Sequence, residues 1–265
     1  MEPLTSLWIE ELSWPEIGRA MEHGYRRLLI CAASTEQHGP HLAENTDELF
    51  GRLLCAEVAK RLGNTLIGPV LRPGLSAHHM RHPGSFTLRP ETFRLLIEDC
   101  VDSGLAHGFT EIVLLASHGT NFAPLEQLAA ELAQKKGAKI VCGMKLTDFM
   151  DLYSEGERMF GLEKGACGGH ACCFETSVML RYFPQYVHME RAERGYMEGN
   201  TPEFAANLFA NGMMGVSPCG IIGDARCASA EMGEAFFELF CRRAVDCVKE
   251  ALENAGSCLL YTSPF

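Results

Sequence analysis

Short apolar runs alternate with segments of helical periodicity along most of the chain, and this alternation restricts the fold more than any other feature. The apolar runs predict buried strands at 27–33, 65–71, 111–116 and 138–142. The periodic segments predict helices at 46–62, 90–107, 122–136, 171–180 and 231–254. Strands separated by helices form a largely parallel sheet that is covered on both faces, so an α/β fold is expected.

The chain shows no internal repeat and no low-complexity linker. Residues 195–224 are rich in Gly and Met, and we expect a loop region there with one short helix at about 201–210. The 265 residues fit a single domain over 1–256. The final residues, 257–265, follow a helix that we expect to end by Gly256, and they resemble translated cloning sequence rather than native protein.

Charge and cysteine usage narrow the class of protein. The net charge of -11 disfavours nucleic acid as a partner, and no apolar stretch is long enough to span a membrane. The 12 cysteines include no CxxC pair and mostly lie in apolar runs, where a reduced cysteine packs as a small hydrophobic residue. The polar, acidic start lacks the apolar core of a signal peptide. A cytoplasmic protein acting on a small molecule is expected.

Residues with metal-ligand chemistry follow the predicted strands. Ligands in open α/β sheets bind beyond the carboxyl ends of the strands. Glu36 and His38 follow the first strand and are two residues apart, so in extended chain they point the same way. Asp47 lies at the start of the next helix, and His118 follows the strand at 111–116. A carboxylate and imidazole set at this edge favours a metal site.

A second segment of the same kind follows a glycine-rich turn. His170 is expected on the turn and Glu175 in the first turns of the helix after it. Each candidate alone has an ordinary structural explanation: a buried structural histidine, a helix N-cap at Asp47, or a solvated carboxylate. It is the coincidence of five ligand-type residues at strand ends and glycine turns that favours the metal site.

Two further groups of residues allow more than one interpretation. His78, His79 and His82 could form an extra metal site, but solvated loop histidines are the stronger expectation for His78 and His82. Cys167, Cys172 and Cys173 could also bind metal, although buried packing is expected.

Several motifs, in order along residues 30–234, resemble those of the creatininase family, the creatinine amidohydrolases. The most specific is STEQHGPHLAENTD at 34–47, and HGTN at 118–121 is similar to the family's His-Gly-Gly-Asn turn. His170-Ala171 and Glu175-Thr176-Ser177 resemble its His-Ala and Glu-Thr-Ser motif. Weaker matches are GLS at 74–76 with His79, PGS at 83–85, GIIGD at 220–224 and GE at 233–234.

This resemblance implies a three-layer α/β/α sandwich with a mainly parallel central sheet. It also implies two divalent metal ions, Zn or Mn with Fe as a third candidate, and a homo-oligomer, often a hexamer. The implied metal ligands are Glu36, His38, Asp47, which bridges the ions, His118 and Glu175. His170 falls on a histidine assigned to substrate handling or proton transfer, and His79 and Asn121 are implied substrate contacts.

One departure from the family pattern bears on the substrate. Members that hydrolyse creatinine have His-Tyr-Glu-Asn at the second motif, and that glutamate is itself a ligand; Thr120 cannot replace it. We therefore expect an amidohydrolase for C–N bonds other than peptide bonds, acting on a cyclic amide, formamide or peptide-like compound rather than creatinine. The alternatives are a non-amide hydrolase that opens a cyclic ketone or lactone on the same scaffold, and an inactive binding protein.

Overall fold

A four-stranded parallel sheet forms the centre of the protein in a computed structural model that describes residues 4–199 and 201–260, the last five by backbone alone. Its strands are β1 (Arg27–Ala32), β2 (Thr65–Leu71), β3 (Glu111–Ala116) and β4 (Lys139–Cys142), in the order β2-β1-β3-β4. All three pairings are parallel. The predicted parallel α/β sheet is confirmed, because each strand is followed by a helix that returns the chain to the same end of the sheet.

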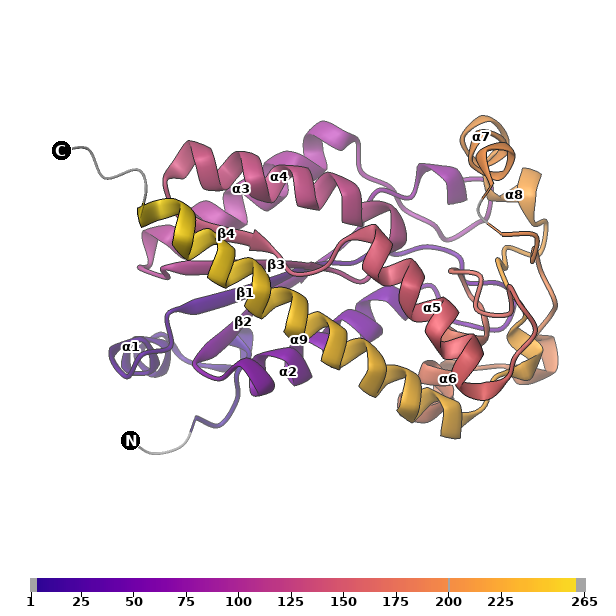
Figure 1. Ribbon diagram of the computed structural model, residues 1–265, viewed down its shortest axis with the longest axis horizontal. Coiled ribbons are helices and arrows are strands. Elements are labelled where there is room, and N and C mark those ends of the chain that lie inside the picture. Colours follow the sequence, from indigo (N-terminus) through magenta and orange to yellow (C-terminus); the bar gives the residue numbers. More distant parts are fainter. Residues whose placement is uncertain (1–3, 200, 261–265) are drawn as a thin grey trace.

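Helices cover both faces of this sheet, which gives the three layers (Figure 1). On one face lie α3 (Pro90–Ala106) and α4 (Phe122–Lys136), and on the other lie α2 (Thr46–Leu62) and α9 (Ala230–Leu260). Neighbouring residues of a strand point to opposite faces. Leu28 and Ile112 accordingly lie against Gly104 of α3. On the other face, the side chains of Leu115 and of Val248 on α9 both lie beside Gly143. The strands are apolar throughout because both faces are buried.

The remaining helices extend beyond the sheet's carboxyl edge or precede its first strand. They are α1 (Trp14–Glu22), α5 (Leu146–Phe160), α6 (Cys173–Tyr182), α7 (Pro202–Asn211) and α8 (Met213–Val216). The sequence analysis predicted the helices corresponding to α6 and α7, and missed α1, α5 and α8. A capping signature marks α1, since Glu16 accepts a hydrogen bond from the backbone N–H of Ser13.

The final helix differs from its prediction at its carboxyl end. Helix α9 continues to Leu260, so the expectation that it ends by Gly256 is wrong. Residues 261–265 of the predicted non-native tail lie outside the described residues.

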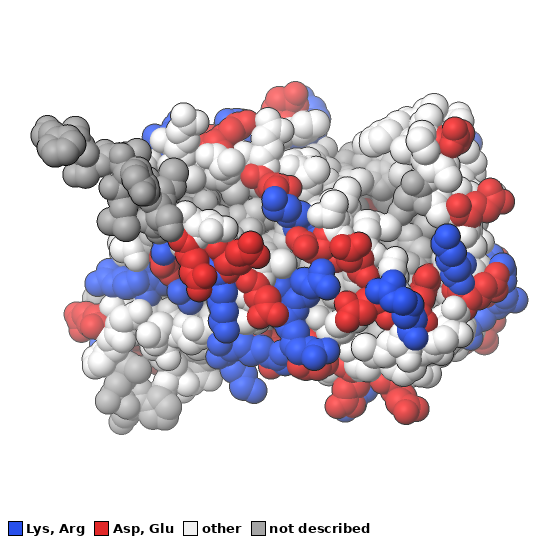
Figure 2. Space-filling view, viewed as in Figure 1, with Lys and Arg blue, Asp and Glu red and all other residues white. Residues whose placement is uncertain are grey.

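Charged side chains of both signs are interspersed on the face shown in Figure 2. Among the described residues Arg61 pairs with Glu238 and Arg243 pairs with Glu155, so these basic groups are matched locally by acidic ones. Within the part of the chain that the structure describes, none of the helices combines the length and apolarity needed to cross a bilayer.

Helices α6 and α9 pack closely through a glycine. A Cβ atom added at Gly233 of α9 would lie 1.9 Å from the carbonyl oxygen of Ser177 on α6. No side chain can be accommodated there unless the two backbones separate. Gly18 of α1, by contrast, has no atom within 4 Å of the corresponding position.

We therefore expect Gly233→Ala to lower the free energy of unfolding by about 1–3 kcal/mol, because it overpacks a backbone contact. Gly18→Ala is the matched control and should raise it by about 0.5–1 kcal/mol, as alanine does in an open helical position. Midpoints of urea denaturation measure both. Equal midpoints for the two variants would contradict the close packing of α6 on α9.

Candidate metal centre

Three neighbouring strands deliver the predicted site residues to one edge of the sheet. The last residues of β1 and β3, Ala32 and Ala116, are register partners. Glu36 and His38 follow β1, His118 follows β3, and His79 lies on a short 3-10 helix (Ala77–His79) after β2. Because the strands are parallel, these segments meet beyond the carboxyl ends, as the sequence predicted.

One group of side chains consists of Glu36, Asp47 and His118. His118 Nδ1 lies 3.1 Å from Glu36 Oε1 and 3.2 Å from Asp47 Oδ2. Each of these three residues is at most 3% exposed. Their donor atoms all lie within 4.8 Å of one another, so one metal ion could contact all three.

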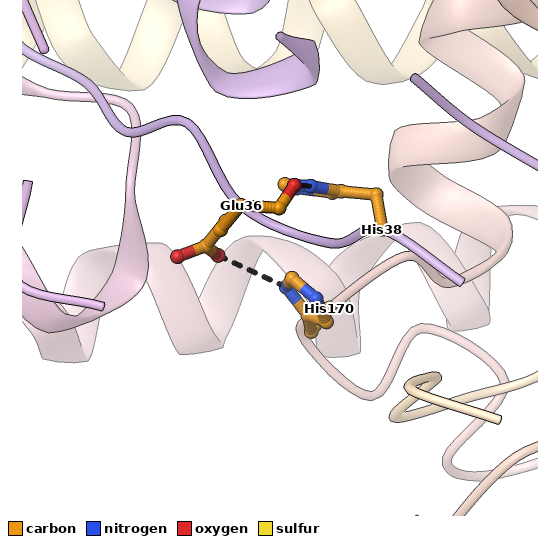
Figure 3. A group of neighbouring side chains, drawn as sticks. All are labelled: Glu36, His38 and His170. Atoms are coloured by element: carbon orange, nitrogen blue, oxygen red, sulfur yellow. Dashed lines mark hydrogen bonds and ion pairs between the residues drawn. The ribbon is translucent and has the colours of Figure 1, made fainter. Parts of the chain in front are cut away.

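A second group consists of Glu36, His38 and His170, whose donor atoms also lie within 4.8 Å of one another. Figure 3 shows the carboxylate of Glu36 directed toward His170, with a separation of 3.6 Å between Oε1 and Nδ1. The rings of His38 and His170 are 4.4 Å apart. Glu36 belongs to both groups.

Asp47 connects the two groups. Its Oδ1 lies 3.3 Å from His38 Nε2, while its Oδ2 faces His118. The alternative role as an N-cap is not realised, because the N-cap of α2 is Asn45 and no side chain caps this helix. The carboxylate of Asp47 is therefore free to face both histidines.

The protonation of three histidines follows from their backbone partners. A carbonyl oxygen only accepts hydrogen bonds, so the ring nitrogen beside it must carry the proton. Three such hydrogen bonds are present: His38 Nδ1 to Glu36 O at 3.1 Å, His118 Nε2 to Leu75 O at 3.2 Å, and His170 Nε2 to Gln37 O at 2.8 Å. In each ring the other nitrogen presents a lone pair to the buried carboxylates. Metal-ligating histidines are oriented in the same way.

Several of the facing atoms have no hydrogen-bond partner among the described residues: both oxygens of Glu36, Oδ2 of Asp47 and Nε2 of His38. A buried carboxylate without a partner is strongly destabilising. Divalent cations placed between the carboxylates and the imidazole lone pairs would satisfy all of these atoms. A mixed oxygen and nitrogen donor set suits Zn and Mn. The residues therefore fit the expected metals.

The pKa shifts of the side chains also indicate that this site needs a cation. Burial alone raises the pKa of Glu36, but His118 and His79 beside it hold that pKa well below its usual range. Burial lowers the pKa of His38, yet Asp47 raises it to about 10. A position that attracts a proton this strongly also attracts a metal ion, which competes with the proton for the same ring nitrogen.

Glu175 lies apart from these two groups. Its Oε1 accepts a hydrogen bond from the hydroxyl of Tyr153, and its Oε2 accepts one from the backbone N–H of Ala171. Burial raises its pKa to about 7. Glu175 and Asp47 both line a cavity of about 10 Å³, room for about one water molecule. Its assignment as a ligand stays a prediction.

The two expected substrate contacts have other partners in this structure. His79 is buried, and its Nε2 lies 3.3 Å from Glu36 Oε1. Asn121 donates through Nδ2 to the carbonyls of Ala32 and Ala33 and accepts through Oδ1 from the N–H of Leu75. Because these bonds use both amide hydrogens and one of the two lone pairs of the amide oxygen, the geometry favours a structural role for Asn121, and its substrate contact stays a prediction.

Other residues around the site were not predicted or were predicted differently. Gln37 is buried and lies between the candidate ligands Glu36 and His38, a position in the sequence that could have indicated a role in the site. No sequence pattern indicated Tyr153. His78 is half-buried with its ring 4.1 Å from that of His79, and both ring nitrogens of His82 are buried. The expectation of a solvated histidine is therefore wrong for the ring nitrogens of His82, and His78 is only partly exposed.

The cysteines near Glu175 are free thiols. Cys167, Cys172 and Cys173 are all buried. They belong to the main hydrophobic core, as predicted.

Comparison with known proteins gives relatives over nearly the whole chain. The family model described as creatinine amidohydrolase matches residues 10–248. The creatinine amidohydrolase of Pseudomonas putida is 26% identical over 92% of this chain and 97% of its own. The mycofactocin precursor peptide peptidase of Mycobacterium ulcerans is 29% identical over 83% of this chain and 82% of its own.

A third relative is the 3-dehydro-scyllo-inosose hydrolase of Thermotoga maritima, 24% identical over 96% of this chain and 86% of its own. Among solved structures, a manganese creatininase aligns with a TM-score of 0.78 at 25% identity over 93% of this chain and 98% of that one. A mutant creatininase described as the Zn-Zn type aligns with a TM-score of 0.80 at 24% identity, again over 93% of this chain and 98% of that one. The motifs, the fold and the family model agree, and the chain belongs to the creatininase family of hydrolases.

Proposed function

We propose that this protein is an amidohydrolase that cleaves a C–N bond with water activated by two divalent metal ions. The observation that carries the proposal is the set of buried, unpartnered carboxylate oxygens on Glu36 and Asp47, which face imidazole lone pairs. The residues proposed to hold the ions are Glu36, His38, Asp47 and His118, with Glu175 as the remaining ligand.

The relatives support both the chemistry and the metals. Two have names that describe hydrolysis of C–N bonds, and solved structures of family members are described as zinc and manganese forms. A pair of bound divalent ions lowers the pKa of a water molecule toward neutrality and polarises a substrate carbonyl.

Asp47 is proposed to bridge the two metal positions. Its two oxygens point to different histidines, at 3.3 Å from His38 and 3.2 Å from His118. Glu36 Oε1 approaches the same nitrogen of His118, Nδ1, at 3.1 Å and also lies near His79 and His170. The chain thus places its negative charge where two cations need to be held close together.

His170 is proposed to carry a proton during the reaction. Its Nε2–H is held by Gln37 O, so Nδ1 is the ring nitrogen that can take up a proton. Nδ1 faces the carboxylate of Glu36, on the metal side of the ring. From there it can receive a proton from the attacking water and release it to the departing nitrogen.

Thr120 bears on the substrate. Its hydroxyl donates to the carbonyl of Leu75 and contacts Nε2 of His118, so it orients a ligand and supplies no charge. With threonine rather than a glutamate at this position, the site has one carboxylate fewer to offset two divalent ions, which leaves an excess of positive charge relative to a site with that glutamate. This excess favours a substrate that carries a carboxylate beside its amide, such as a peptide-like compound, over neutral creatinine.

Ring opening of a cyclic ketone is the second candidate function. It is favoured by the relative named 3-dehydro-scyllo-inosose hydrolase, which aligns over nearly the full chain. The same residues would serve, since polarising a ketone and activating water require the same metal pair.

Asp47→Ala is expected to remove bound Zn²⁺ or Mn²⁺ and hydrolytic activity together, because it deletes the bridge between the two histidines. Asp151→Ala, an exposed aspartate on α5, is the control and should retain both. Metal content by elemental mass spectrometry measures the outcome. A full metal load in the Asp47 variant would contradict the bridging role.

His170→Ala is expected to keep the metal and to lower kcat by about 10²–10⁴-fold, the range for loss of a proton-transferring group. His188→Ala replaces an exposed histidine and is the control. Loss of metal from the His170 variant would instead identify His170 as a ligand, together with Glu36 and His38.

A substrate panel on the metal-loaded protein tests the reaction class. It comprises creatinine, N-formyl amino acids, lactams, short peptides with free carboxyl ends, and sugar-derived cyclic ketones. We expect turnover of a carboxylate-bearing amide to exceed that of creatinine. Turnover confined to the cyclic ketones would overturn the amidohydrolase proposal in favour of ring opening.

A further inference from the structure

Gln37 is a buried residue between the candidate ligands Glu36 and His38, and its side chain makes an unusually complete set of hydrogen bonds. It is 4% exposed. Its amide contacts Gly39, Gly220, His79 and His170. These partners come from several separate parts of the chain, so the orientation of this amide affects several of them at once.

The orientation of the amide follows from its two backbone partners. Oε1 accepts a hydrogen bond from the N–H of Gly39 at 2.9 Å, and Nε2 donates to the carbonyl of Gly220 at 3.0 Å. A backbone N–H only donates and a carbonyl only accepts, so the oxygen and nitrogen cannot be exchanged. Gly220 also packs directly on the amide, since a Cβ there would meet Gln37 Oε1 at 1.9 Å.

The fixed amide determines the protonation of His79. The second N–H of Gln37 Nε2 has two ring nitrogens within reach, His79 Nδ1 at 2.8 Å and His170 Nε2 at 2.9 Å. His170 Nε2 already donates to the carbonyl of Gln37 and cannot accept, so this N–H goes to His79 Nδ1. Nδ1 must therefore accept, which leaves the ring proton on Nε2. Nε2 lies 3.3 Å from Glu36 Oε1, so the protonated nitrogen of His79 is next to that carboxylate, although the two form no hydrogen bond in this structure.

His79 therefore presents a different group to the carboxylates than the other three histidines of the site do. His38, His118 and His170 direct a lone pair toward the carboxylates, whereas the nitrogen of His79 that lies nearest Glu36 carries the proton. An N–H cannot bind a metal ion, but it can hold a carboxylate oxygen in place. Hydrogen bonds of this kind orient metal ligands and raise metal affinity.

We propose that Gln37 is a positioning residue of the metal centre, whose amide keeps the proton of His79 on Nε2 so that His79 holds Glu36 in its ligating orientation. The inference rests on the proposed metal function for its consequence, but the tautomer of His79 follows from the hydrogen bonds alone.

The test compares Gln37→Met with the wild type. Methionine has a similar length and cannot donate a hydrogen bond to His79. The dissociation constant for Zn²⁺, measured by competition with a chromophoric chelator, is expected to rise about 10–100-fold, as for other changes to groups that orient metal ligands. Gln127→Met is the matched control, because Gln127 is an exposed glutamine that bonds only Glu131 through its amide nitrogen among the described residues.

A direct readout is the ¹⁵N NMR spectrum of the histidine rings, with His79 assigned by its absence in His79→Phe. We expect His79 in the wild type to show a protonated Nε2 and an unprotonated Nδ1, and Gln37→Met to lose this single pattern. If Gln37→Met does not fold, Gln37→Glu replaces it, and the ring proton of His79 is then expected on Nδ1, where the new carboxylate accepts a hydrogen bond from it.

A double-variant cycle separates positioning from general support of the fold. If Gln37 acts through His79, Gln37→Met should change the Zn²⁺ affinity of His79→Phe by less than about twofold. If the two substitutions weaken Zn²⁺ binding independently, so that their effects on the dissociation constant multiply in the double variant, the proposal is overturned. It is also overturned if neither replacement of Gln37 changes the ¹⁵N spectrum of His79. A wild-type protein that binds no Zn²⁺ would contradict the proposed function instead, and the tautomer measurement would still decide the role of Gln37.

Discussion

The burial of two carboxylates among imidazoles is the constraint on which the rest of the site depends. Glu36 and Asp47 are almost completely inaccessible to solvent, and three of their four oxygens lack a hydrogen-bond donor among the described residues. Such an arrangement is stable only when positive charge compensates it. The backbone carbonyls that fix the tautomers of His38, His118 and His170 mean that these three rings supply positive charge to the carboxylates only by taking up a proton or binding a cation.

The parallel sheet explains why these groups can meet at all. In a parallel sheet the carboxyl ends of all strands lie at one edge, so β2, β1 and β3 each contribute a segment to the same place. Helix α2 begins at this edge and brings Asp47 with it. Close approach of the backbones is possible because Gly74 leaves no Cβ against the carbonyl of Ala33.

Much of this arrangement could be predicted from local patterns. The strands are continuous apolar runs, and Glu36, His38 and His118 directly follow two of them, so periodicity and strand order were sufficient. Tyr153 could not be predicted, because α5 has no marker in the sequence that relates it to the site. The separation of Glu175 from the two ligand groups and the burial of His82 depend on how distant segments pack, which no local pattern records.

The four histidines show why residue type alone does not define a ligand. His79 and His118 are both histidines in the segment that follows a strand of the sheet, so residue type and location do not distinguish them. They differ only in what the far nitrogen of the ring meets: an amide N–H of Gln37 for His79 and the carbonyl of Leu75 for His118. A donor on the far side gives a ring that holds a carboxylate, and an acceptor gives a ring that can bind a metal. The division of roles is therefore encoded in partners distant in sequence.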